Sequence, residues 1–326
     1  MNHVVTEENL DNLESYLADT SLNLQWPSVF VLPPWLQTWW KIFGAETEML
    51  LRAVRRNDNI IGIAPLMRKK ETAYFLGSTD VCDYMDFIVT PGMETEFFSE
   101  LIDNLKNNGI KELDLAHVRP DSAVLKFLQP VADSKGHTAT VTPEEISLET
   151  DLPADWDEYL ASLTGKQRHE VRRKIRRLYE AGSVDYHFTE DDEPVSGYID
   201  TFLGMFTESR QDKADFLTEQ MDRFFRLLTA NMSEAGLLKF GILKLNNKPI
   251  ACIMCFDYNG CIYLYNSGYD PEYNYLSAGL LSKVMSIQDS IQRGKKRYDF
   301  LKGSEPYKYH LGGREVVLSK CLIDLK

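Results

Sequence analysis

The C-terminal half of the chain carries a group of side chains that suit acid–base chemistry. Tyr265 and Asp270 flank a short turn, and Asp299 and Lys308 follow further along the chain. Phenol, carboxylate and ammonium groups are common donors and acceptors of protons in enzyme sites. We therefore take Tyr265, Asp270, Asp299 and Lys308 as the candidate catalytic residues.

Small residues lie between these side chains, where a predicted strand (261–267) leads through a turn into a predicted helix. The start of a helix offers free backbone N–H groups, which together with the helix dipole bind phosphate without a basic side chain. Ser277, Ala278 and Gly279 would let a bulky ligand approach this backbone closely. We predict that a phosphate-bearing cofactor binds at Asn274, Leu276, Ser277, Ala278, Gly279 and Leu280.

Residues 166–178 form the densest charge block, with seven basic residues among the first twelve. Val171, Ile175 and Leu178 are spaced as one apolar stripe of a helix, and arginines follow other lines along it. This positive charge calls for a negative partner, which is either the protein's own acidic residues or an acidic or phosphorylated ligand. Both alternatives stay open. The acidic candidates are Asp151, Asp155, Asp157 and the run 190–193, and the candidate substrate contacts are Arg168, Arg172 and Tyr307.

Several of these residues have a structural alternative. Asp299 lies in an apolar strand, where a carboxylate must be paired or protonated. Tyr307 and Lys308 would equally suit a solvated loop, and His169 suits the helix surface. A covalent intermediate is disfavoured because no Ser-His-Asp or Cys-His spacing is visible.

The cysteines do not indicate a metal site. Cys252 and Cys255 match C-x-x-C, but they lie in a predicted strand, where positions three apart point to opposite faces. We expect them to be buried in the core and expect no zinc site. Five cysteines in a chain of 326 residues also fit a reducing compartment better than a disulfide framework.

The elements that would position the site occur twice. Residues 49–68 and 237–257 each read as strand, Asn-rich turn, strand, and a further strand and a helix follow in both halves. Each helix ends at a glycine with a charged strand behind it, and the spacing from Gly109 to Asp114 equals that from Gly294 to Asp299. In the second copy we expect strand 297–301 to run parallel to the preceding strand, 261–267.

The two copies differ at the start of the helix. The first copy has Thr90-Pro91-Gly92-Met93-Glu94 there, and proline lacks the N–H group that a phosphate would need. Two glutamates, Glu94 and Glu96, add negative charge. We therefore place the cofactor in the second copy alone. Asp114 mirrors Asp299, which indicates that part of the apparent catalytic set belongs to the fold.

Composition and length limit the number of domains and the classes of partner. The chain is long enough for two domains, and loop-like sequence near position 150 predicts domains at 1–150 and 151–326.

The net charge of −13 argues against a surface that binds nucleic acids in general, with a charged tRNA as the exception. No apolar run approaches the ~20 residues of a membrane helix, and no signal segment is visible, so we expect a cytoplasmic protein.

These residues resemble the GNAT (N-acetyltransferase) fold, and more narrowly the CelD/BcsL-type acetyltransferases of bacterial cellulose and exopolysaccharide loci, relatives of the FemABX aminoacyltransferases. The resemblance is best over 156–310. It rests on LTGKQR at 163–168, YNSGYD at 265–270, LSAG at 276–279, YDFLKG at 298–303 and YK at 307–308.

The resemblance implies a mixed α/β protein with tandem GNAT-like domains, the first of them degenerate. It implies transfer of an acyl group from acetyl-CoA or another acyl-CoA to a nitrogen or oxygen of a small, sugar-linked or cell-envelope acceptor. Transfer would be direct, in a ternary complex, with a backbone N–H stabilising the oxyanion. It further implies that Lys308 faces the reacting groups.

The chain departs from the usual GNAT turn, Q/R-x-x-G-x-G/A. Asn274 stands at the first position, and Ser277 replaces the middle glycine. The departure keeps two alternatives open. One is an aminoacyl-tRNA donor of the FemABX kind, and the other is a non-catalytic accessory role in polysaccharide synthesis.

Overall fold

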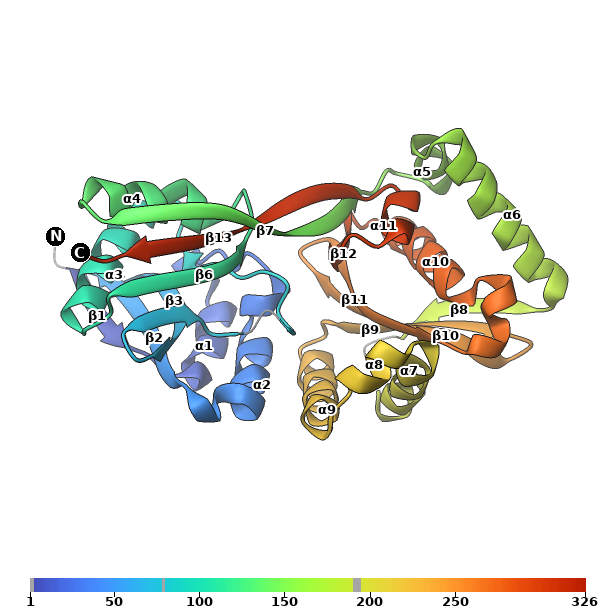
Figure 1. Cartoon of the computed structure of the whole chain (residues 1–326), viewed down its shortest axis with the longest axis horizontal. Helices are drawn as coiled ribbons and strands as arrows, with labels where there is room; N and C mark the ends of the chain where they lie inside the picture. The colour runs from blue at the N-terminus through green and yellow to red at the C-terminus, as the bar shows by residue number, and fades with distance from the viewer. Residues whose placement is uncertain (1–2, 78–79, 190–194) are drawn as a thin grey trace. The chain divides into compact units, whose positions relative to one another are not determined.

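The computed structural model describes residues 3–77, 80–189 and 195–326 of the chain (Figure 1). The chain forms two compact units. The N-terminal unit comprises Met1–Ile146 and Val316–Lys326, and the C-terminal unit comprises Ser147–Glu315. The sequence had placed a boundary at 150 and the whole C-terminus in the second domain. Residues 316–326 belong to the N-terminal unit because strand β13 (Arg314–Asp324) pairs with β6 (Glu112–Val118) there.

The N-terminal unit is a mixed sheet with helices. Its strands follow the order β1-β2-β3-β4-β6-β13-β7, and β5 pairs with β3. Of the pairs, β4–β6 is parallel, whereas β1–β2, β2–β3, β3–β4 and β6–β13 are antiparallel. The remaining strands are β1 (His3–Glu7), β2 (Glu48–Arg56), β3 (Asn59–Lys69), β4 (Thr72–Phe75), β5 (Ile88–Val89) and β7 (Thr138–Asp151), and the helices are α1 (Leu13–Ala18), α2 (Pro33–Phe43), α3 (Glu94–Asn107) and α4 (Gln129–Ser134).

The C-terminal unit repeats this plan. Its strands follow the order β7-β12-β11-β10-β9-β8. Helix α10 contacts β8 to β11, while α7 and α9 contact the same sheet from the opposite face (Figure 1). The strands are β8 (Val184–Phe188), β9 (Leu238–Leu245), β10 (Lys248–Tyr258), β11 (Cys261–Tyr269) and β12 (Arg297–Lys302), and the helices are α5 (Trp156–Ser162), α6 (Gly165–Ala181), α7 (Ser196–Ser209), α8 (Gln211–Phe216), α9 (Glu219–Glu234), α10 (Ala278–Gln292) and α11 (Pro306–His310).

The repeat predicted from the sequence is present in the structure. Each unit has an antiparallel hairpin, β2–β3 or β9–β10, whose turn residues take positive φ angles. Each also has a parallel pair joined by a helix: β4 and β6 with α3 between them, and β11 and β12 with α10 between them. The predicted mixed α/β architecture and the parallel crossover are therefore confirmed.

The parallel pair β11–β12 separates after a short stretch. Cys261–Tyr263 pairs with Arg297–Asp299, and no later residue of either strand pairs with the other in the described part of the chain. Local irregularities explain the separation. The pairing of β10 with β11 shifts at Tyr265, and that of β12 with β7 shifts between Asp299 and Leu301, which has a φ of 62°. A β-bulge of this kind bends its strand and redirects side chains.

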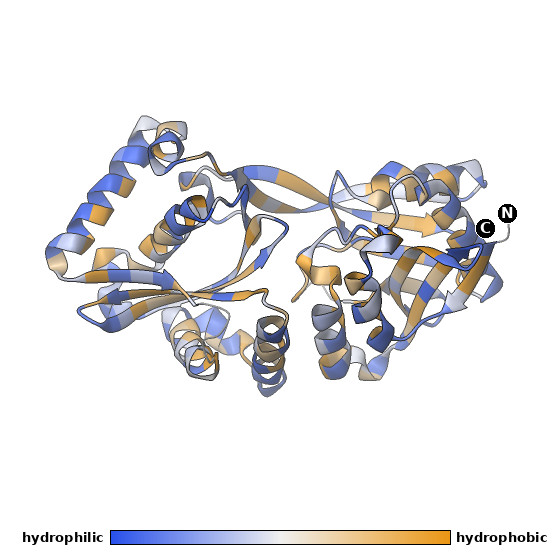
Figure 2. Ribbon diagram, turned by 180° about the vertical axis from the view of Figure 1, so that it is seen from behind, coloured by the Kyte–Doolittle hydropathy of each residue, from blue (hydrophilic) through white to orange (hydrophobic). Residues whose placement is uncertain are grey.

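Helix α6 is mostly hydrophilic, in contrast to the strands and α10 (Figure 2). Thr164 begins it with a capping box, in which its side chain accepts from the Gln167 N–H. Among its residues, Val171 and Leu178 are buried, and they anchor one narrow side of the helix. Most of its arginines are exposed, so the predicted apolar stripe and charged faces both exist.

Candidate active site

The predicted phosphate turn lies where β11 leads into α10. A 3-10 turn, Pro271–Leu276, precedes Ser277, which adopts a left-handed conformation with a φ of 61°. The Ser277 N–H donates to the Asn274 carbonyl at 2.8 Å. The N–H groups of Ala278 and Gly279 have no hydrogen-bond partner within the described residues. They are free donors at the positive end of the helix dipole.

Gly279 lets the aromatic ring of Tyr269 pack against the start of α10. A Cβ atom at this position would lie 2.7 Å from Cδ1 of Tyr269, which is closer than side chains tolerate. The glycine is therefore needed for the contact between the last residue of β11 and the first turn of the helix. This contact fixes the position of the free N–H groups relative to the strand.

One ammonium group of the basic helix reaches the turn. Lys174 Nζ donates to Ser277 Oγ at 2.6 Å, and it also lies 3.4 Å from Glu170 Oε1. Sequence reasoning pointed to other basic residues of α6 and missed Lys174. The signal was available, because Lys174 lies between the buried Val171 and Leu178 and so projects from the anchored side of the helix.

The two arginines predicted to bind substrate lie elsewhere on α6. Arg168 Nη1 donates to the carbonyls of Leu160, Ala161 and Leu163, each at 3.4 Å, and so caps the C-terminal end of α5. Arg172 is exposed, and its nearest acidic partner is Asp157 at 4.0 Å. The proposed acidic run 190–193 lies outside the described residues.

Asp270 is held by the turn and by a lysine. Its carboxylate accepts the Glu272 N–H at 2.9 Å and lies 3.0 Å from Lys248 Nζ. Burial acts to raise the pKa of Asp270, but the hydrogen bonds from Lys248 and from the Glu272 N–H outweigh it and lower the pKa. Asp270 therefore holds the 3-10 turn in place as a carboxylate.

Asp299 is 1% exposed and supports the bulge in β12. Its Oδ1 accepts the N–H of Leu301 at 2.8 Å, across the residue that leaves the strand register. Its counterpart Asp114 forms an ion pair with Lys320 at 2.8 Å. The two mirrored aspartates thus make different contacts, and that of Asp299 fixes backbone geometry next to the gap between β11 and β12.

Lys308 is 2% exposed and binds main-chain oxygens. Its Nζ donates to the carbonyls of Leu301 at 3.0 Å, Gly303 at 3.1 Å and Lys302, and it pairs with Glu305 at 3.0 Å. This ammonium group fastens the end of β12 to α11. Neither the solvated loop nor an open reactive lysine describes this environment.

The two predicted tyrosines lie in aromatic surroundings. Tyr265, at the bulge in β11, has its ring centroid 5.3 Å from that of Phe256 and 6.2 Å from that of Phe225. Tyr307 lies against Phe300, with centroids 6.5 Å apart, and burial raises the pKa of its hydroxyl well above the usual value. The amino group of Lys283 lies over the ring of Tyr307, 5.0 Å from its centroid.

Sequence reasoning also missed a cluster of polar groups at the end of β11. Lys283 of α10 donates to Ser267 Oγ at 3.0 Å and to the Gly279 carbonyl at 2.7 Å. Lys213 of α8 donates to the Ser267 carbonyl. Both lysines occur in helices without any recognisable motif, and only the fold brings them to one serine.

The first copy lacks the features of the second at its helix start. The carboxylate of Glu94 accepts the Gly92 N–H at 2.8 Å, and Glu96 pairs with His3 at 3.0 Å. Two carboxylates therefore occupy the region where the second copy has free N–H groups and Lys174.

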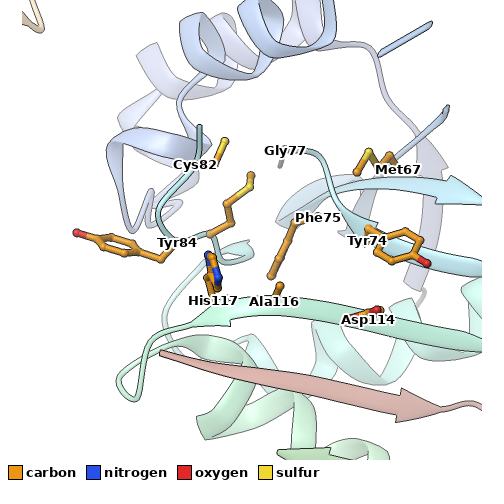
Figure 3. Close-up of a pocket in the computed structure, with 10 residues that line it drawn as sticks. Met67, Tyr74, Phe75, Gly77, Cys82, Tyr84, Asp114, Ala116 and His117 are labelled. Atoms are coloured by element: carbon orange, nitrogen blue, oxygen red, sulfur yellow. The ribbon is translucent and has the colours of Figure 1, made fainter. Parts of the chain in front are cut away.

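A cavity of ≈ 220 Å³ lies in the N-terminal unit, where β4 and β6 have ceased to pair (Figure 3). Its volume is below the roughly 300–1,000 Å³ of most ligand pockets. None of the predicted site residues lines it. The lining residues are Met67, Tyr74, Phe75, Gly77, Cys82, Tyr84, Met85, Asp114, Ala116 and His117.

The sequence of the C-terminal unit is similar to a known domain family. Residues 165–309 match the family model of the acetyltransferase (GNAT) domain. This match lies within the C-terminal unit and covers less than half of the chain. The matched segment includes the turn at Ser277, the Lys174 ammonium and the cluster at Ser267.

Solved structures extend the likeness of fold beyond the GNAT domain. The structure of FemX is 11% identical, with a TM-score of 0.66 over 98% of this chain and 96% of that one. The C-terminal domain of a lysylphosphatidylglycerol synthetase from Agrobacterium fabrum is 8% identical, with a TM-score of 0.59 over 96% and 92%. A tandem GNAT protein from the clavulanic acid biosynthesis pathway is 10% identical, with a TM-score of 0.51 over 98% of both chains. No curated protein matches the chain.

Residues 3–77, 80–189 and 195–326 hold neither a membrane-crossing helix nor a cluster of metal ligands. None of their helices combines the length and the apolar character that a membrane crossing requires. The same residues contain no group of three or more histidine, cysteine, aspartate or glutamate side chains placed to hold a metal ion. Cys252 and Cys255 are fully buried, as predicted.

Proposed function

We propose that the GNAT domain transfers an acyl group from an acyl-CoA, with acetyl-CoA as the foremost donor, to a nitrogen or oxygen of a small acceptor. One observation carries this proposal. The unpaired N–H groups of Ala278 and Gly279 lie beside the Lys174–Ser277 contact, just after a strand whose pairing with β12 ends at Tyr263.

The residues present suit the two ends of such a donor. The pyrophosphate would accept hydrogen bonds from the Ala278 and Gly279 N–H groups and charge from Lys174. The amide-rich arm would extend along the edge of β11 beyond Tyr263, where β12 no longer pairs. An exposed strand edge binds an extended chain through its backbone groups. Bound there, the thioester would supply the activated acyl carbon.

The acceptor is proposed from the family resemblance and from exposed side chains. The CelD/BcsL resemblance favours a sugar-linked or cell-envelope acceptor in a cytoplasmic reaction, and Arg172 and Tyr307 are its proposed contacts. Direct transfer in a ternary complex follows from the absence of a recognisable nucleophile motif. Acidic or phosphorylated groups on the acceptor would suit the exposed arginines of α6.

Those same arginines favour a second candidate, an aminoacyl-tRNA donor of the FemABX kind. Arg172, Arg176 and Arg177 are exposed along α6, and such a row suits phosphate groups. The net charge of −13 weighs against it. Binding of charged tRNA that weakens steeply with salt would favour this donor over acyl-CoA. An accessory role without catalysis would be favoured if neither donor bound.

Calorimetry with acetyl-CoA, longer acyl-CoAs and free CoA tests the donor. We expect all of them to bind, because the proposed phosphate contacts are common to them. Mass spectrometry of reactions with a library of amines and sugars then tests the acceptor. If no acyl-CoA and no CoA binds, the proposal is wrong.

A further inference from the structure

Three side chains from separate elements meet at the end of β11. Lys283 Nζ of α10 is 3.0 Å from Ser267 Oγ of β11 and 2.7 Å from the carbonyl of Gly279. It also lies over the ring of Tyr307 of α11, 5.0 Å from the centroid. Lys283 is only 6% exposed, so its amine contacts these protein groups in place of water.

The contacts of Lys283 are those that a neutral amine can make. A neutral amine has two N–H donors and one lone pair. The Gly279 carbonyl can only accept, and the face of an aromatic ring attracts an N–H group. As an ammonium, Lys283 donates its third N–H to Ser267 Oγ; once it has lost that proton, its lone pair faces Ser267 and accepts from the hydroxyl instead.

The charges around Lys283 also favour its neutral form. The groups that face it are Lys213 from α8, Glu305 just before α11, Lys308 from α11, and the thiol of Cys255 from β10. Burial, followed by the positive charge of Lys213, lowers the pKa of Lys283 to about 7. No carboxylate in the described residues forms an ion pair with Lys283, and Glu305 pairs with Lys308 instead.

The position of Ser267 suits contact with a substrate. It is half-buried and lies beyond Tyr263, the last residue of β11 that pairs with β12. Lys283 is one turn beyond Gly279 on the helix that begins at the proposed phosphate site. The pair therefore lies beside the strand edge along which the donor would extend.

We propose that Ser267 and Lys283 form a proton relay that activates the nucleophile of the acceptor. This inference rests on the proposed acyltransferase function. As the acceptor nitrogen or oxygen attacks the acyl carbon, its proton passes to Ser267 Oγ, and the hydroxyl proton of Ser267 passes to Lys283 Nζ. The carbon–sulfur bond then breaks, and the same relay in reverse protonates the leaving thiolate, so the enzyme ends unchanged.

The first test measures the titration of Lys283 without any substrate. Nuclear magnetic resonance of the full chain with lysine labelled at Cε would follow the resonance that Lys283→Met removes. We expect a midpoint near pH 7. Lys213→Met should raise that midpoint, because it removes the neighbouring positive charge. A midpoint near the ordinary lysine value of about 10.4 would overturn the relay.

The second test separates the relay from donor binding. Ser267→Ala and Lys283→Met should each keep acetyl-CoA affinity within a few-fold, while transfer to the acceptor found by the library screen falls by roughly 10²–10⁴-fold. Ser290→Ala is the control, since its hydroxyl bonds the Ser286 carbonyl in the same helix and should leave transfer unchanged.

Four results would contradict the relay. Transfer that survives in Ser267→Ala would exclude it, and so would an acyl group found covalently on Ser267, which would make the serine a nucleophile instead. If wild-type protein fails to bind acetyl-CoA, the proposed function itself fails and the relay fails with it. A normal acetyl-CoA affinity together with a Lys283 midpoint at the ordinary lysine value rejects the relay alone.

Discussion

The ammonium group of Lys174 distinguishes the helix start of α10 from that of α3. It meets Ser277 at 2.6 Å, whereas the equivalent region of the first copy holds Glu94 and Glu96. A cation beside free N–H groups attracts an anion, and carboxylates beside them repel one. At this scale the two copies have opposite charge preferences although their folds agree.

Replacing Lys174 by alanine should weaken binding of CoA by roughly tenfold. The loss corresponds to one partly exposed charge-assisted hydrogen bond, whose contribution is about 1.5 kcal/mol. Lys166→Ala, at the exposed N-terminal end of the same helix, serves as the matched control. Calorimetry on both variants measures the difference, and equal affinities would show that Lys174 does not contact the ligand.

The stability of the protein should rise between pH 7 and pH 9 through Lys283. Burial lowers its pKa in the folded protein to about 7, from an ordinary value of 10.5 in the unfolded chain. The unfolded chain therefore binds more protons in this range, and the free energy of unfolding increases with pH by at most about 1.4 kcal/mol per unit. Urea unfolding of wild type and Lys283→Met should differ in this slope. Parallel curves for the two proteins would contradict the lowered pKa.

Lys308→Met should destabilise the protein rather than act on donor binding. The substitution leaves the carbonyls of Leu301, Lys302 and Gly303 without their buried donor, at a cost of roughly 1–3 kcal/mol. Thermal unfolding measures the loss, with Lys166→Met as an exposed control. If the variant kept its stability and lost acyl transfer, the result would instead support the catalytic role that the sequence suggested for Lys308.

The sequence predicted where the proposed phosphate turn lies, but it did not predict which lysines lie beside it or beside Ser267. The turn at Asn274–Leu280 was predicted from small side chains before a helix, because helix starts follow local rules. Lys174, Lys213 and Lys283 were missed because each lies in a helix whose pattern shows only burial or charge. Their meeting with Ser277 or Ser267 depends on tertiary packing, which spacing along the chain does not report.

At the scale of elements, the gap between β11 and β12 is the feature that makes a site. Two irregularities create it: the bulge at Tyr265 and the break in register that Asp299 supports at Leu301. The sequence predicted both strands and their parallel direction. It did not predict where the pairing ends, because bulges leave a weak mark in a pattern of alternating residues.

Arg168→Ala should loosen the junction of α5 and α6. Its guanidinium caps three carbonyls at the end of α5, and their loss should cost about 1 kcal/mol. The pattern of hydrogen exchange at Leu160 to Leu163 would report this change, with CoA affinity unaffected. If CoA affinity fell and exchange stayed the same, Arg168 would be a ligand contact as first predicted.

At the scale of the whole molecule, a duplicated fold carries one proposed donor site. The repeat was visible in the sequence because hairpin turns and helix-ending glycines recur at matching positions. The return of residues 316–326 to the N-terminal unit was not visible, since β13 pairs with a strand some 200 residues away. Such distant pairing leaves no local pattern.

The most direct test of the account is calorimetry of CoA with Gly279→Asp and Thr95→Asp. Each change places a carboxylate at the second residue of a crossover helix, in α10 or in α3. Circular dichroism should first show that both variants keep the fold. Gly279→Asn displaces the Tyr269 ring to the same extent without adding a charge, and it should bind CoA more tightly than Gly279→Asp. We predict one CoA per chain in wild type and in Thr95→Asp, and no detectable binding in Gly279→Asp. Equal binding by the two variants, or loss in Thr95→Asp alone, would contradict the assignment of the donor site to the C-terminal unit.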